Sequence, residues 1–173
     1  MPINVPSGVP AVGKVSMALV PIASLTNRNA PSAAIINGAA ALNFSCHVLG
    51  DGYSRTPEQA RAERRRICSA TTYDVLGPRK VNFDAIRAVY DPQKPTDAVS
   101  KLYAMAVEGT EFYLVERLGK DGQSDFATGD LVDVYRIKIG VKHKLIPGDE
   151  GEFEFTFEVT NLDTPTTDVL LVA

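Results

Sequence analysis

Two neighbouring segments near the C-terminus alternate between apolar and polar residues with a period of two. Such alternation is the pattern of a β-strand with one buried face. The first segment spans residues 131–145 and the second spans 152–160; the turn-forming sequence Pro-Gly-Asp-Glu-Gly separates them at 147–151. The two segments therefore predict an antiparallel hairpin. Its inner face consists of Leu131, Tyr135, Ile137, Ile139, Val141, Leu145, Phe153, Phe155, Phe157 and Val159.

The outer faces of this hairpin carry opposite charges. Folding the chain about 147–151 places Lys144 opposite Glu152, Lys142 opposite Glu154, and Lys138 opposite Glu158. Each such pair favours its register by roughly 0.2–1 kcal/mol, and a one-residue slip would turn the phenylalanines into water. We call these three charge pairs the ladder and interpret them as the contacts that set the register. The charged face itself is either solvated or in contact with another subunit.

The other segments complete a mainly β pattern with one helix. The helix is predicted at 96–107, where Val99, Leu102, Tyr103 and Ala106 form one apolar face. The remaining predicted strands lie at 14–22, at 33–49 (as one or two strands), at 79–91, at 111–118 and at 168–173. We predict an antiparallel β-sandwich or barrel with one flanking α-helix. A length of 173 residues is consistent with a single domain over 1–173.

Two regions lack a core-forming pattern. Residues 1–13 contain three prolines and the β-branched apolar residues Ile3, Val5, Val9 and Val12, which predicts an extended arm that lies on its own domain or reaches a neighbouring subunit. Residues 50–63 read as a long polar loop. Within it, Thr56 and Pro57 resemble a helix start, but 61–66 is basic without an apolar stripe, so a solvated loop with a helical turn is expected. A strand that begins at Arg64 is the alternative.

Composition and motifs exclude several functions. A net charge of −3 does not predict binding to nucleic acid or to an anionic membrane surface. Residues 1–10 do not have the pattern of a signal peptide. Cys46 and Cys68 are expected to be free thiols, with a single bridge as the alternative. His47 and His143 lack metal-ligand spacing, and no nucleophile elbow or phosphate-binding loop occurs. We therefore expect no enzyme activity, metal or cofactor.

A series of motifs in the second half resembles a known family. Tyr90-Asp-Pro-Gln93 precedes the predicted helix, and 109–117 (GTEFYLVER), 126–135 (FATGDLVDVY) and 168–173 (DVLLVA) follow it. This order resembles the major tail tube proteins of siphophages, the long non-contractile-tailed phages, particularly those with actinobacterial hosts. The resemblance covers roughly the second half of the chain, while the first half is similar in layout.

The resemblance implies a structural role in the virion tail. Subunits of this family form hexameric rings that stack into a tube, with DNA passing through an acidic lumen without specific binding. It implies assembly in the host cytoplasm, partners that include the tape measure, tail terminator and distal tail proteins, and no membrane. The arm and the loops 24–32 and 51–63 would join subunits. The implied assembly residues are Ile3, Val5, Val9, Val12, Arg28, Arg61, Arg64 and Arg65.

Other functions fit the same pattern. A tail terminator or head–tail connector component would form a single ring and stop there. A monomeric small-molecule-binding β-barrel would enclose an apolar cavity, although the absence of Trp and an aromatic content of 8% disfavour an aromatic-lined pocket. Filament formation distinguishes the tube protein from both.

Overall fold

The protein is mainly β and its strands pair antiparallel, as the sequence predicts. A computed structural model describes residues 8–148 and 151–173. Within them the strands are β1 (Val15–Pro21), β2 (Leu42–Asn43), β3 (Arg55–Arg65), β4 (Thr72–Phe83), β5 (Ile86–Val89), β6 (Glu111–Leu118), β7 (Leu131–Lys144), β8 (Glu154–Asn161) and β9 (Thr166–Leu170). The helices are α1 (Ala33–Ile36) and α2 (Lys101–Met105), with 3₁₀ turns η1 (Ser45–His47) and η2 (Ala98–Ser100).

Two predicted elements have a different form. The strand prediction at 33–49 is confirmed only at β2 and is wrong elsewhere: Ala33 and Ile36 are both buried at a spacing of three, which is helical, and they form α1. The predicted helix at 96–107 is a 3₁₀ turn followed by the short α2, because Ala106 leaves the helical region with φ −73° and ψ 72°. Leu102 and Ala106 are both buried, as the predicted apolar face requires, but Val99 of that face is exposed.

The chain divides into two compact units, each built from separate segments. Unit 1 comprises residues 1–47, 112–134 and 166–173. In it β1 pairs with both β2 and β6, and the first residues of β7 pair with β9. Its core consists of Ala18, Val20, Leu25, Ala33, Ile36, Val115, Phe126, Val132, Val134 and Leu171. The single domain predicted over 1–173 stays a prediction about cooperative folding.

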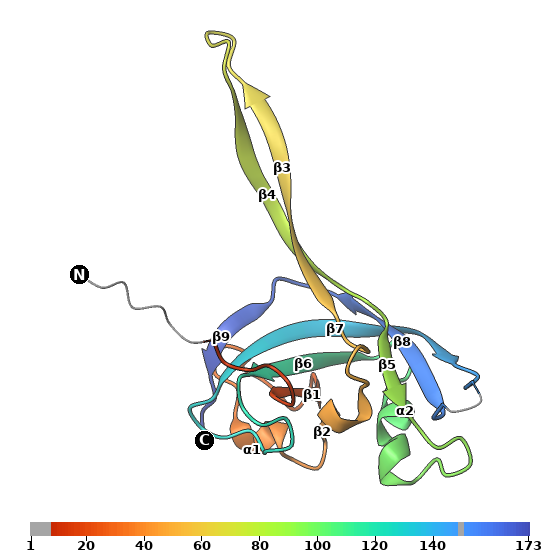
Figure 1. Cartoon of the computed structure of the whole chain (residues 1–173). Coiled ribbons are helices and arrows are strands. Elements are labelled where there is room, and N and C mark those ends of the chain that lie inside the picture. Colours follow the sequence, from red (N-terminus) through yellow and green to blue (C-terminus); the bar gives the residue numbers. More distant parts are fainter. Residues whose placement is uncertain (1–7, 149–150) are drawn as a thin grey trace. The chain divides into compact units, whose positions relative to one another are not determined.

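Unit 2 comprises residues 48–111 and 135–165. In it the second half of β7 pairs with β8, and β8 pairs with β5 and, at one position, with β4. Aromatic rings fill the space beside α2: Tyr90 stacks on Tyr103 with ring centres 4.7 Å apart, and Phe155 meets Tyr103 edge-on at 5.0 Å. Strands β3 and β4 form a two-stranded ribbon that runs away from β5 and α2 (Figure 1).

The predicted ladder between β7 and β8 is wrong in register. Lys138 lies opposite Thr160, Lys142 opposite Phe157 and Lys144 opposite Phe155, and Glu152 precedes β8. Before the bulge the pairing is already two residues away from the predicted register, and a β-bulge between Ile139 and Lys142 adds one more residue and reverses the alternation beyond it. The predicted inner face is wrong at four residues: Val141 and Leu145, which follow the bulge, and Leu131 and Phe153 are all exposed.

The bulge gives the two lysines a different environment from the one predicted. Lys142 donates a hydrogen bond to the carbonyl of Tyr103, and its Nζ lies 3.8 Å from the centre of the Tyr103 ring. Burial and the neighbouring charge of Lys144 lower the pKa of Lys142. Glu154 forms an ion pair with Arg87 at 3.4 Å. Lys142 and Lys144 therefore cover the aromatic cluster of unit 2, where cation–π attraction stabilises the contact.

Candidate assembly interface

The β3–β4 ribbon replaces most of the predicted polar loop at 50–63. The loop prediction and its helical turn are wrong, and so is a strand start at Arg64, since β3 already begins at Arg55. The two strands join through ten residue pairs, from Arg55–Phe83 at the base to Arg65–Thr72 near the turn. Nearly every residue of both strands is exposed. Residues 79–83 of β4 fall within the strand predicted at 79–91. The other residues of the ribbon have no buried face, so no two-residue alternation reveals them as strands.

The outer half of the ribbon, residues 61–76, is here called the tip. Its register places Ala62, Arg64, Tyr73 and Val75 on one face, since Ala62 pairs with Val75 and Arg64 pairs with Tyr73. Tyr73, Val75, Leu76 and Ile67 are all exposed, Ile67 completely. An isolated two-stranded ribbon is marginally stable in water. Exposed apolar side chains on such a ribbon are typical of a surface that another protein covers.

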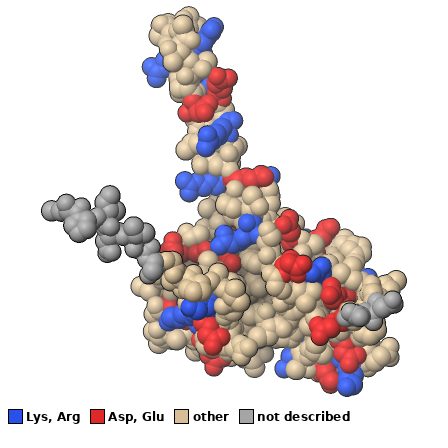
Figure 2. Space-filling view, viewed as in Figure 1, with Lys and Arg blue, Asp and Glu red and all other residues tan. Residues whose placement is uncertain are grey.

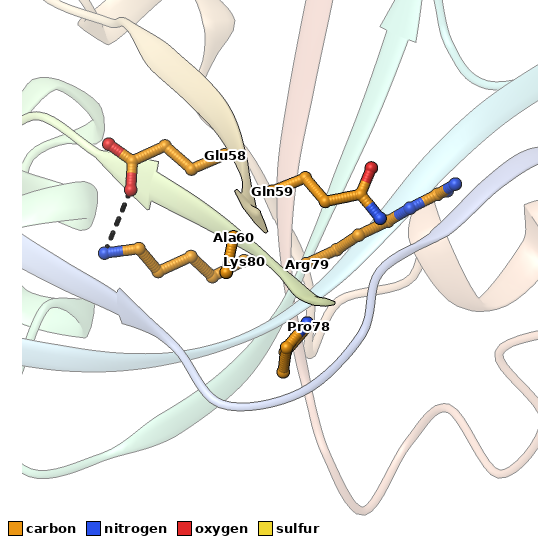
Figure 3. A pocket seen from close by; sticks show the side chains of 6 residues that line it. All are labelled: Glu58, Gln59, Ala60, Pro78, Arg79 and Lys80. Atoms are coloured by element: carbon orange, nitrogen blue, oxygen red, sulfur yellow. Dashed lines mark ion pairs between the residues drawn. The ribbon is translucent and has the colours of Figure 1, made fainter. Parts of the chain in front are cut away.

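A bulge divides the tip from the base of the ribbon. Ala60 faces both Gly77 and Pro78, because the pairing shifts between Gln59–Arg79 and Arg61–Leu76. The bulge leaves an open hollow of about 390 Å³ lined by Glu58, Gln59, Ala60, Pro78, Arg79 and Lys80. Figure 3 shows Glu58 and Lys80 pointing to one side of the ribbon and Gln59 and Arg79 to the other.

The residues that line the hollow at the bulge form contacts that hold the two strands of the ribbon together. Lys80 pairs with Glu58 at 3.0 Å, and this hydrogen bond and charge, with a hydrogen bond from Asn82, lower the pKa of Glu58. Gln59 donates to the carbonyl of Gly77, which the bulge leaves available. Pro78 has no backbone donor, so it also limits uncontrolled strand addition at this position.

The ribbon is basic and the remainder of the chain is acidic. Residues 55–83 contain seven Lys and Arg against three Asp and Glu, whereas the other residues contain 11 against 18. Figure 2 shows Lys and Arg side chains at several levels along the ribbon, with fewer Asp and Glu between them. Arg61, Arg64 and Arg65 of the predicted interface all lie exposed on β3. The ribbon thus brings these three residues together on one element.

The other predicted interface residues lie outside the ribbon. Val9 and Val12 are exposed, and Arg28 is half-buried in the segment between β1 and α1. Ile3 and Val5 lie outside the described residues. The sequence analysis missed Ile67, Tyr73, Val75 and Leu76. The one signal for them was the enrichment in β-branched and aromatic residues at 71–76.

A buried ion pair holds the loop between β6 and β7 in unit 1. Arg117 donates to the Asp130 carboxylate at 2.7 Å, to Ser16 at 2.9 Å and to backbone carbonyls of the loop, including that of Asp125 at 2.7 Å. Lys120 binds the second oxygen of Asp130. Burial alone raises the pKa of Asp130, but hydrogen bonds from Lys120, the Ala127 amide and Arg117 outweigh it and lower the pKa to about 2.

This ion pair explains part of the motif pattern. Arg117 ends one of the quoted motifs, and Asp130 lies in the next. The guanidinium spans the loop between them, and its Cζ lies 4.8 Å from the centre of the Phe126 ring. The spacing of the two motifs therefore reflects the closure of one loop. Sequence reasoning did not identify the pair, because no local pattern marks two residues that meet only in the folded chain.

The described residues contain no group of three or more His, Cys, Asp or Glu that could hold a metal ion. None of the described helices is long and apolar enough to cross a membrane. Cys46 and Cys68 are both free and exposed, as the sequence predicts, and Cys68 lies in the turn of the ribbon. The most prominent chemistry of the described surface is thus the charged and apolar ribbon.

The fold and its surface define a mainly β protein that presents a long, exposed two-stranded ribbon. The sequence matches the family Phage tail tube protein over residues 1–173, and the chain belongs to this family. The family is structural and places the protein in the virion tail. A search of curated proteins finds no match.

Proposed function

We propose that the protein polymerises as stacked hexameric rings into the phage tail tube, the conduit for DNA delivery. The observation that carries the proposal is the β3–β4 ribbon of a chain that belongs to the tail tube family. The ribbon buries little of its own surface, and its tip presents both apolar and charged side chains. A neighbouring subunit would bury this surface and so stabilise both the ribbon and the assembly.

The arm and loops are the further contacts of this assembly. Ile3, Val5, Val9 and Val12 would bind a neighbouring subunit through their apolar side chains, and Arg28 would contribute from the loop at 24–32. Arg61, Arg64 and Arg65 act from the ribbon. Closing the free edges of the ribbon against other subunits would also prevent uncontrolled strand pairing.

The charge distribution supports passage of DNA without binding. Outside the ribbon the chain carries more acidic than basic residues, so a lumen lined by that part repels phosphate. The tape measure, tail terminator and distal tail proteins complete the proposed set of partners. Assembly takes place in the cytoplasm of the host, which we propose to be an actinobacterium.

Negative-stain electron microscopy of the purified protein across a concentration series tests the proposal. Hollow tubes with a regular axial repeat and sixfold rings in end views are the expected result. Isolated rings that never stack would instead indicate a tail terminator or connector component. Monomers at every concentration, together with uptake of a small molecule, would indicate a binding β-barrel and overturn the proposal.

A further inference from the structure

A second hollow lies in unit 2, beside the start of α2. Val89, Tyr90, Asp91, Val99, Glu152 and Phe153 line it, and it measures about 450 Å³. Its apolar lining is accessible, since 51% of Phe153 and 37% of Val99 are exposed. Its two charged residues, Asp91 and Glu152, are both acidic. We call this site the aromatic hollow.

The aromatic hollow and the tip have complementary chemistry. The tip carries Arg61, Arg64, Arg65 and Arg66 against Glu63 and Asp74. Arginine pairs with carboxylates through a planar fork and also stacks on aromatic rings. The hollow offers both kinds of partner, because the carboxylates of Asp91 and Glu152 accompany the exposed ring of Phe153.

The face of the tip that fits the hollow is the one with Arg64 and Tyr73. These two residues are direct cross-strand neighbours, with Val75 beside them on the same face. Tyrosine and arginine are the residue types that most often dominate binding energy at protein interfaces. Both are exposed here, and Tyr73 is 47% exposed.

The tip of one chain does not reach the aromatic hollow of the same chain. The eleven residues of β3 rise about 3.3 Å each, so the strand carries the tip roughly 35 Å from its base. The ribbon runs away from β5 and α2, where the hollow lies (Figure 1). Contact between two different patches on two copies is heterologous, and such contacts produce rings or filaments.

We propose that the ribbon tip of one subunit docks into the aromatic hollow of a second copy of this chain. Arg64 pairs with Glu152 of that copy, and Tyr73 packs beside Phe153. The docking rests on the proposed function, because it assigns one specific contact within the tube. The docking also gives the contact a direction, since each subunit inserts its tip into one neighbour and binds the tip of another neighbour in its own hollow.

The native Cys68 at the turn of the ribbon permits a direct cross-linking test. In a Cys46→Ser chain, Cys68 is the one remaining thiol. Val99→Cys then adds a thiol at the hollow, and Gln123→Cys adds one on the exposed β6–β7 loop as the matched control. Assembled samples are treated with a mild oxidant and separated under non-reducing conditions.

The expected result is a ladder of linked chains from Val99→Cys in assembled samples, absent in dilute subunits and abolished by Cys68→Ser. Tubes in which Val99→Cys links no more than Gln123→Cys would overturn the docking while leaving the proposed function intact. If the unmodified chain forms no tubes, the proposed function fails separately. Val99→Cys subunits that stay unlinked at the highest concentration would then overturn the docking as well.

A charge exchange provides a second test that does not depend on the cysteine variants. Arg64→Glu and Glu152→Arg are surface changes, so melting temperatures should stay close to that of the unmodified chain. Each substitution alone should raise the subunit concentration needed for assembly about tenfold, and the double variant should recover most of the lost assembly. A double variant that shows the sum of the two defects would contradict the Arg64–Glu152 pairing.

Discussion

Arg117 donates a hydrogen bond to Asp130 over 2.7 Å, and both side chains are at least 98% buried. The pair closes the loop between β6 and β7 in unit 1. Breaking a buried ion pair by removing one partner is costly, because the remaining charge stays buried without compensation.

Asp130→Asn should destabilise the folded protein by about 3–5 kcal/mol, because Arg117 then lacks its buried counter-charge. Urea unfolding followed by circular dichroism measures the change. Asp125→Asn is the matched control: its side chain is exposed and it contributes to the loop through its backbone carbonyl. A loss below about 1 kcal/mol for Asp130→Asn would show that the ion pair is not a main support of the loop.

Stability should fall in acid through the same carboxylate. The pKa of Asp130 in the folded protein is about 2, below the value of about 4 in an unfolded chain. Its stabilising contribution is therefore complete above pH of about 4 and disappears as the pH falls towards 2, for a total of roughly 2 kcal/mol. Asp130→Asn should lack this part of the pH dependence. Identical slopes in both proteins between these pH values would contradict the assignment.

Gly140→Ala should destabilise unit 2 by about 1–3 kcal/mol. A Cβ at position 140 would lie 3.0 Å from the Cβ of Glu158 across the bulge, which is closer than normal contact. Gly148→Ala is the control, since a Cβ there has open space. Thermal unfolding compares the two variants. Equal melting temperatures would mean that β7 and β8 do not approach in this way.

Deletion of residues 1–10 should prevent tube growth and leave a folded monomer. Residues 11–13 are retained because Ala11 and Gly13 accept backbone hydrogen bonds from Lys14 and Gly122. The removed segment carries Ile3, Val5 and Val9 of the proposed interface. Sedimentation and electron microscopy report assembly, and circular dichroism reports folding. Normal tubes from the shortened chain would show that the arm does not join subunits.

The sequence predicted the strands that have one buried face. Glu111–Leu118 has the bounds of β6, and Phe155, Phe157 and Val159 of β8 point inward as expected. Burial on one side produces the alternation from which such strands are recognised. Most of the β3–β4 ribbon is exposed on both sides, so the sequence predicts only its last residues, 79–83, as a strand, and the polar sequence before them resembles a loop.

Two other features depend on tertiary contacts that no local pattern encodes. The pairing of β7 with β8 differs from the predicted register on both sides of the bulge after Ile139, and Gly140 in an otherwise regular strand was a signal for the bulge alone. The Arg117–Asp130 pair forms between residues 13 positions apart. The assembly residues were predicted in part: Arg61, Arg64 and Arg65 lie on the ribbon, while the apolar residues of the tip were missed.

The most direct test of the account is to shorten the ribbon. Gln59 and Arg79 are directly paired, so replacing residues 60–78 with Asn-Gly joins them through a two-residue turn. The unmodified chain should form hollow tubes in the electron microscope. The shortened chain should stay a folded monomer at the same concentrations. Tubes of normal diameter and repeat from the shortened chain would contradict the assembly role of the ribbon.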